Sequence, residues 1–201
     1  MPNLNTPRGF LPVGTLDGSP LSGALRAYRI ASGYSTNIFQ GDVVKFLTTG
    51  FINKSAAGDL SRGIFAGVTW INAQGIPQYS NYWPASTTTL GSQAATALVY
   101  DSPYLLMEAQ FTNSTANPTV AALGALFDFI DNTGSTQTGL SGEGLDWTTL
   151  ATSAKAFRVI DFVPRGDNDV ASSSSAYARV LCTWAAHDFS VATTVANAVG
   201  I

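Results

Sequence analysis

The feature that most constrains the fold is a series of short apolar runs, each followed within a few residues by glycine, asparagine or another turn-forming residue. The clearest run is 63–70 (GIFAGVTW), in which Ile64, Val68 and Trp70 share one face of a predicted strand. Similar runs lie at 28–32, 42–47, 95–100, 105–111, 156–163 and 176–187. Many short strands separated by turns are typical of antiparallel sandwiches and barrels. The sequence therefore predicts a mainly β fold, either an antiparallel β-barrel or a β-sandwich.

Helix signals are few. The segment 118–130 (PTVAALGALFDFI) can begin with one short helix after Pro118, and 131–144 is a polar, glycine-rich loop. No repeat of fixed period is present, which argues against a solenoid or a propeller. We therefore expect at most one or two short helices.

Residues 1–26 differ from the rest of the chain because four prolines, with four glycines among them, are spread along them. The prolines prevent a helix, and no apolar stretch has the length of a signal peptide core or a membrane span. The segment is nevertheless too apolar for a solvated tail, through Leu4, Phe10, Leu11, Val13 and Leu16. A disordered leader is one interpretation. We expect an extended arm over 1–26 that becomes ordered along a partner, followed by one β-rich domain over 27–201.

Charge is scarce in this chain of 201 residues. Charged residues make up 11% of it, against roughly 25% in typical soluble domains, and the formal net charge is -3. No run of Lys or Arg is present, which argues against direct binding of nucleic acid. A surface with few charges suits packing against other subunits, although a secreted β protein has a similar composition. We expect synthesis in a cytoplasm and no association with a membrane.

The single cysteine and the single histidine, Cys182 and His187, lie close enough in sequence to suggest a catalytic pair. On a strand, their odd separation places them on opposite faces, about 16 Å apart along the chain. A thiolate and an imidazole that react together must lie within about 3 Å. The sequence therefore predicts a buried, inert Cys182 and a surface His187.

Other catalytic or metal-binding patterns are missing or incomplete. One cysteine and one histidine do not make an ordinary zinc site, and the sequence has no GxSxG elbow and no phosphate-binding glycine loop. Four carboxylates in and beside the glycine-rich loop can flank a glycosidic bond: Asp128, Asp131, Glu143 and Asp146. Carboxylates in such a loop are typical of turns and caps, and the RGD tripeptide at 165–167 is also expected to form a turn. We expect no enzyme, no catalytic residue, no cofactor and no metal.

Seven stretches follow one another over most of the chain. They are TPRGFLPVG (6–14), IASGYSTNIFQGDVVKF (30–46), AAGDLSRGIFAGVTW (56–70), YWPAST (82–87), VYDSPYLLMEAQF (99–111), LATSAKAFRVIDFVPRGDND (150–169) and YARVLCTWAAHDF (177–189). In this order they resemble the decoration, or cement, proteins of tailed bacteriophage capsids. Members of that family commonly end their last strand in an Asn-x-His-like segment, where this chain has AAHDF.

The resemblance implies a structural protein of the virion surface. Such proteins bind the outside of an assembled icosahedral head, often as homotrimers, and stabilise contacts between subunits of the major capsid protein. An extended arm can add main-chain hydrogen bonds to a strand edge of a neighbour. Within the arm, we expect Arg8, Phe10, Leu11 and Val13 to contact the capsid.

Two alternatives stay open. The chain can be another virion part, such as a tail or fibre module, or a carbohydrate-binding β domain in which Trp70, Trp83 and Trp147 stack on sugars. The other alternative is a glycan-cleaving enzyme that uses the four carboxylates named above.

Overall fold

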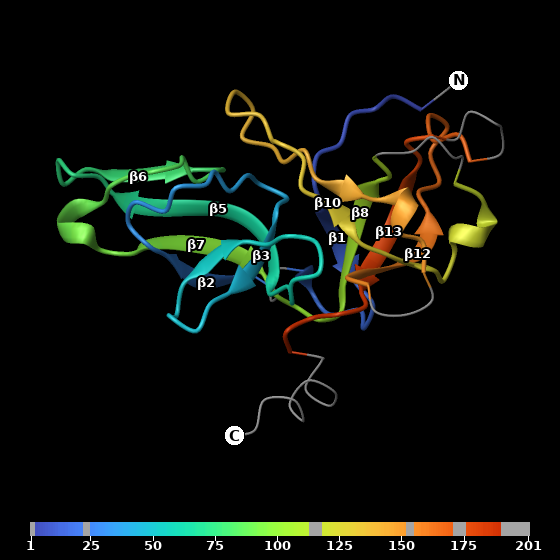
Figure 1. Ribbon diagram of the computed structural model, residues 1–201, viewed down its shortest axis with the longest axis horizontal. Coiled ribbons are helices and arrows are strands. Elements are labelled where there is room, and N and C mark those ends of the chain that lie inside the picture. The colour runs from blue at the N-terminus through green and yellow to red at the C-terminus, as the bar shows by residue number, and fades with distance from the viewer. Residues whose placement is uncertain (1–2, 22–24, 113–117, 152–154, 171–175, 190–201) are drawn as a thin grey trace.

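The computed structural model describes residues 3–21, 25–112, 118–151, 155–170 and 176–189. Over these residues the protein is mainly β, with antiparallel sheets in a sandwich-like arrangement and without a closed barrel. The prediction of a mainly β, antiparallel fold is therefore confirmed, with a sandwich-like arrangement. The molecule has two halves that lie side by side along its longest axis (Figure 1).

The first sheet forms one half. Its strand order is β1 (Leu11–Thr15), β8 (Leu105–Gln110), β13 (Arg179–Trp184), β12 (Phe157–Phe162) and β9 (Leu126–Phe127). A small ladder of β10 (Phe129–Ile130) and β11 (Gly144–Leu145) lies beside this sheet. Alternation along β8 directs Leu105, Met107 and Ala109 into an aromatic-rich core, and it leaves Glu108 and Gln110 on the opposite face.

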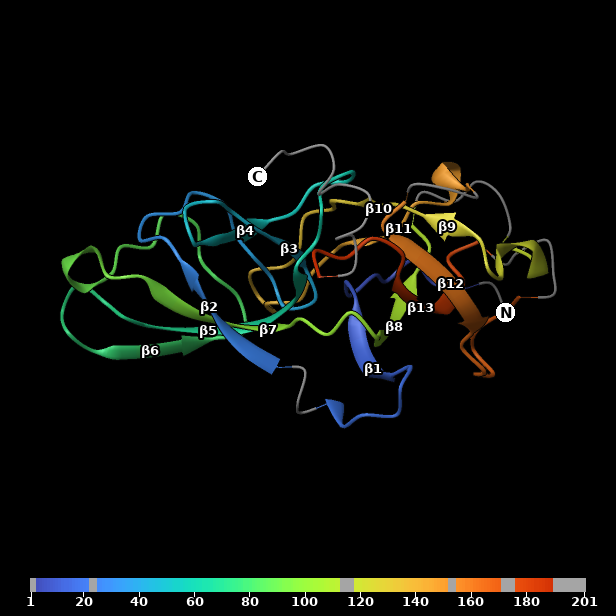
Figure 2. The same ribbon diagram turned by 90° about the horizontal axis from the view of Figure 1, so that it is seen from below.

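The second sheet is built entirely from the chain between β1 and β8. It contains β2 (Leu25–Ile30), β7 (Ala95–Tyr100), β5 (Gly63–Ile71), β3 (Val43–Phe46) and β4 (Ile52–Lys54) in this order, and β6 (Pro77–Ser80) pairs with β5. Its strands surround a second core that includes Ile30, Phe65 and Trp83. Figure 2 shows the two sheets as neighbours, joined by several crossings of the chain.

Helical structure in the described residues consists of short 3-10 turns: Leu90–Ser92, Val120–Ala122 and Trp147–Thr149. The helix expected after Pro118 is one of these turns, and the Thr119 hydroxyl caps it by accepting from the Ala121 amide at 3.3 Å. Gly124, with a positive φ of 77°, turns the chain away from the helix, and β9 and β10 follow. The segment 118–130 therefore holds one short 3-10 turn followed by two short strands.

The N-terminal segment is part of this fold, which corrects one expectation. Phe10 is wholly buried in the first core, where its ring stacks on Phe157 with the centroids 4.2 Å apart. The Gly9 amide donates to the Glu143 carbonyl at 3.2 Å, and the Phe10 amide donates to the Gly41 carbonyl at 2.9 Å. Gly9 has a φ of 73°, and a Cβ there would overlap the Gly41 carbonyl, so only glycine fits. Phe10 thus packs inside its own chain and is not exposed for contact with a capsid.

The end of the described chain joins the two halves a second time. After β13, His187 forms a parallel bridge with Ser61, and the Asp188 amide donates to the Ser61 carbonyl at 3.0 Å. The Asp188 carboxylate pairs with Arg62 at 2.8 Å, and the Arg62 guanidinium lies over the Phe189 ring. These contacts attach the last strand of the first sheet to the start of β5.

If Phe10 holds the N-terminal segment, Phe10→Ala should lower the free energy of unfolding by about 3–5 kcal/mol, as large aromatic-to-alanine changes in cores do. The neighbouring change Leu11→Ala removes a side chain that is 50% exposed and should cost less than about 1 kcal/mol. Urea unfolding of both variants measures the two values. Equal, small losses would show that Phe10 is not a core residue.

Candidate interaction surface

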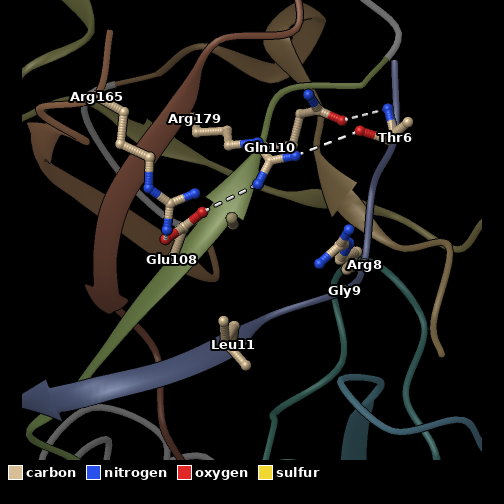
Figure 3. Close-up of a pocket in the computed structure, with 9 residues that line it drawn as sticks. Thr6, Arg8, Gly9, Leu11, Glu108, Gln110, Arg165 and Arg179 are labelled. Carbon is tan, nitrogen blue, oxygen red and sulfur yellow. Dashed lines mark hydrogen bonds and ion pairs between the residues drawn. The ribbon is translucent and has the colours of Figure 1, made fainter. Parts of the chain in front are cut away.

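Residues before β1 lie against the face of the first sheet that points away from its core. Gln110 fixes them there: its Oε1 accepts from the Thr6 amide at 2.9 Å (Figure 3). Its Nε2 donates to the carbonyls of Leu4 and Tyr177, each at 2.8 Å. Asn3 also exchanges two hydrogen bonds with the Asp169 backbone. The segment is therefore ordered by contacts within its own chain.

Glu108 is the charged centre of this face. Its side chain is only 9% exposed, and a carboxylate so poorly hydrated needs close partners. Arg165 binds one oxygen at 2.9 Å and Arg179 binds the other at 3.3 Å, as Figure 3 shows from the side of the N-terminal segment. Arg179 also donates to the Thr6 hydroxyl at 3.3 Å, which connects the ion pairs to the N-terminal segment.

Two of the hollows near this arrangement are bordered by Arg8. The smaller one, of about 80 Å³, is lined by the residues of Figure 3, among them Arg8, Leu11, Arg165 and Arg179. The larger one, of about 200 Å³, lies between the two halves and is lined by Arg8 and Leu11 together with apolar groups such as Phe65 and Tyr100. Arg8 and Leu11 border both hollows, so the two are neighbours on one surface.

Strand β1 forms the edge of the first sheet next to these hollows. Leu11 and Val13 leave 50% and 45% of their surface exposed and lie close together on this edge strand. Pro12 lacks an amide hydrogen and is tolerated because β1 is an edge strand, and the register with β8 shifts between Pro12 and Gly14. Of the four predicted contact residues, Arg8, Leu11 and Val13 thus lie on the surface, and Phe10 does not.

A second group of charged residues is buried where the two halves meet. The Lys54 ammonium group lies 3.3 Å from Asp42, 2.5 Å from Asp131 and 3.4 Å from Glu143. Asp42 and Glu143 are wholly buried, and Glu143 also accepts from the Val43 amide at 2.9 Å. Sequence reasoning considered Asp131 and Glu143 but missed Asp42 and Lys54, whose only signal is a charge at the end of an apolar run.

Burial and mutual repulsion alter the pKa values of this group. Burial raises the pKa of Glu143 well above its ordinary range, and the neighbouring charge of Asp42 adds to the effect. Burial likewise raises the pKa of Asp42, against the attraction of Lys54. For Lys54, burial acts to lower the pKa, but the carboxylates of Asp42 and Glu143 outweigh it and raise the pKa above the usual value. Lys54 therefore stays charged and compensates the buried carboxylates.

The other two candidate carboxylates have structural partners. Asp128 pairs with Lys155 at 2.9 Å and accepts from the Ala156 amide at 3.1 Å. Asp146 caps the 3-10 turn that follows it, through the Thr148 amide at 2.9 Å. Because Glu143 is wholly buried, a glycosidic bond cannot reach it in this conformation. No two of the four carboxylates therefore face each other across an open cleft, as the two acids of a glycosidase do.

Cys182 and His187 occupy separate environments. Cys182 lies in the first core, where burial raises the pKa of its thiol, as expected for an inert cysteine. The expectation of a surface His187 is wrong: the ring is wholly buried, with Nε2 2.8 Å from the Arg62 carbonyl and Nδ1 accepting from the Phe189 amide. Burial lowers the pKa of His187, so the ring is neutral at physiological pH and joins the two halves.

The three tryptophans proposed to stack on sugars belong to different cores. Trp70 packs edge-on against the buried Trp83 in the second core, whereas Trp147 packs on Phe111 and Phe127 in the first. They do not form one sugar-binding surface. The RGD tripeptide at 165–167 is a turn, closed by the Asn168 amide on the Arg165 carbonyl at 3.1 Å.

The described ranges contain neither a cluster of metal ligands nor a helix able to span a membrane. No group of three or more His, Cys, Asp or Glu side chains there is arranged to hold a metal ion. No helix in the same residues has the length and apolar character needed to cross a membrane.

Replacing Lys54 with methionine leaves Asp42 and Glu143 buried without their cation. We expect Lys54→Met to lower the free energy of unfolding by about 3–5 kcal/mol at neutral pH. The control Lys45→Met breaks the half-buried pair with Asp59 and should cost about 1 kcal/mol or less.

The loss of stability in the Lys54→Met variant should also depend on pH. Carboxyl groups whose pKa is raised on folding bind more protons in the folded state, so their contribution to stability is complete below the unfolded pKa and is lost as the pH rises through the folded pKa. The deficit of Lys54→Met should therefore shrink as the pH falls from about 7 to about 5. A deficit that is independent of pH, or equal to that of Lys45→Met, would contradict the buried cluster.

The chain was compared with known proteins in three ways. No protein-family model matches its sequence, no curated protein matches it, and no solved structure matches its fold.

Proposed function

We propose that this protein is a non-enzymatic decoration, or cement, protein that binds the outside of an assembled phage head and stabilises contacts between major capsid subunits. The observation that carries the proposal is the β1 edge, where Leu11 and Val13 remain about half exposed although the chain around them is fixed. Exposed apolar side chains on an ordered edge strand are typical of a surface that another protein covers. The resemblance of the sequence to capsid decoration proteins suggests that this partner is the major capsid protein.

Order within the segment supports binding. Gln110, Glu143 and Gly41 hold residues 4–10 in place through backbone hydrogen bonds, so little conformational entropy is left to lose on association. This differs from the arm expected from the sequence, which would gain its order only on the partner. In the proposed function the contact is a preformed strand edge and not a flexible extension.

Assembly in several copies would strengthen such a contact. Because Leu11 and Val13 are already about half buried, covering the exposed remainder contributes only about 1 kcal/mol for each side chain. A homotrimer on a symmetric lattice would bind through several equal contacts at once, which multiplies a modest single affinity. We therefore include a homotrimer in the proposal, with the virion surface as its location.

The proposal is tested by sedimentation with expanded, undecorated heads of the phage that encodes the protein. The wild-type protein should bind saturably, at a fixed ratio to the major capsid protein. Leu11→Asp combined with Val13→Asp should weaken binding at least about tenfold, because two charges would then be buried at an apolar contact.

The matched control is Ile76→Asp, which places a charge on an exposed isoleucine in the turn between β5 and β6, away from β1. It should bind heads as the wild-type protein does. Removing residues 1–20 is a poor test because it also removes Phe10 and β1 from the fold. A folded wild-type protein that does not bind heads would contradict the proposal and direct attention to tail or fibre parts.

A further inference from the structure

Positive charge is concentrated at the small hollow of Figure 3. Arg8, Arg165 and Arg179 line it, and Glu108 is the only acidic residue among the lining groups, in a chain whose net charge is -3. The two oxygens of Glu108 are each occupied by one arginine, which leaves the site with an excess of positive charge. An anionic partner is therefore favoured here over a cationic one.

Free hydrogen-bonding capacity is also present. A guanidinium has five N–H donors in a planar fork, and the side chains of Arg165 and Arg179 are 46% and 24% exposed after pairing with Glu108. Among the described residues, the exposed Arg8 side chain has neither a hydrogen bond nor an ion pair, and so its whole fork is available.

Size and surroundings suggest the kind of anion. The hollow of about 80 Å³ is large enough for a carboxylate group, which matches the arginine fork in a bidentate manner. The neighbouring hollow of about 200 Å³ is mostly apolar and shares Arg8 and Leu11 with the first. A ligand that places a carboxylate in one hollow and an apolar side chain in the other fits both.

We propose that Arg8, Arg165 and Arg179 bind a carboxylate of an extended, acidic polypeptide segment, whose adjacent apolar side chain enters the hollow between the two halves. The inference deepens the proposed function, and it rests on that function in placing the segment on the capsid shell. The carboxylate site itself is testable without a capsid.

Polypeptide is favoured over nucleic acid by the layout of the surface. Binding along a phosphate backbone needs a stripe of cations, whereas these arginines surround one hollow and one of their neighbours is Glu108. The edge of β1 next to the site offers backbone groups that an extended peptide can meet. The exposed Leu11 at the border of both hollows also suits a side chain better than a sugar–phosphate chain.

Fluorescence anisotropy tests the site with three labelled probes at low salt. The first is a blocked six-residue peptide of alternating glutamate and valine, the second has glutamine in place of glutamate, and the third is a short thymidine oligonucleotide. The full chain should bind the glutamate peptide at least about tenfold more tightly than the glutamine peptide, since charge-assisted hydrogen bonds to a carboxylate are lost. It should bind the oligonucleotide more weakly than the glutamate peptide.

Variants then assign the site to Arg8. Arg8→Gln should weaken binding of the glutamate peptide about tenfold, and Arg8→Glu should weaken it further. Arg29→Glu is the matched control, because Arg29 is an exposed arginine on β2 in the other sheet. It should change binding less than about twofold, and urea unfolding should show that all three variants are folded.

Several outcomes would overturn the inference: no binding of the glutamate peptide, equal binding of both peptides, equal effects of Arg8→Glu and Arg29→Glu, or tighter binding of the oligonucleotide. Sedimentation with heads separates this failure from that of the proposed function. If wild-type protein binds heads and the Arg8→Glu variant binds them as tightly as the Arg29→Glu variant does, the carboxylate site has no role in capsid binding, and the proposed function stands. Protein that shows Arg8-dependent peptide binding but no binding to heads would remove the capsid role alone.

Discussion

The contacts of Gly9 and Phe10 hold the two halves of this protein together, and the rest of the structure depends on them. Their amides donate to Glu143, in the loop before β11, and to Gly41, just before β3, while the Phe10 ring stacks on Phe157 in the first core. One short segment therefore contacts both halves of the molecule. It also sets where β1 begins, and so which side chains of the segment face outward: Arg8 and Leu11 border the hollows, and Val13 lies further along the edge.

The same junction contains two wholly buried carboxylates, Asp42 and Glu143, whose removal from water is unfavourable. Glu143 contributes its carbonyl to Gly9 and its carboxylate to the Val43 amide and to Lys54, so the buried ion cluster and the N-terminal segment share one residue. Buried charges are stable only with well-placed partners. We infer that the cluster fixes the relation between the two halves, because Lys54 pairs with Asp42 from one half and with Glu143 from the other, and its removal would leave both carboxylates without their cation.

Much of the fold follows from local patterns. The apolar runs at 63–70, 95–100 and 105–111 correspond to β5, β7 and β8, because short apolar runs between turn residues are typical of strands. The expected face of 63–70 is wrong in part: a register shift between Phe65 and Gly67 places Phe65 and Val68 in the second core and Ile64 in the first. Strand β1 was missed since Pro12 and Gly14 weaken the strand signal, and β1 is an edge held by β8 from far along the chain. The buried positions of Phe10 and His187 and the Asp42–Lys54–Glu143 cluster were also not predictable, because each depends on contacts between segments distant in sequence.

The central claim is that the N-terminal segment is ordered within the isolated protein, before any partner is present. Amide hydrogen exchange of the Gly9 and Phe10 N–H groups, followed by NMR on the purified protein without capsid, tests it most directly. The account predicts protection of both amides close to that of the β8 amides, since all belong to one cooperative core. Exchange at the rate of an unstructured chain, with β8 still protected, would contradict it and would restore the interpretation of residues 1–26 as an arm that becomes ordered on its partner.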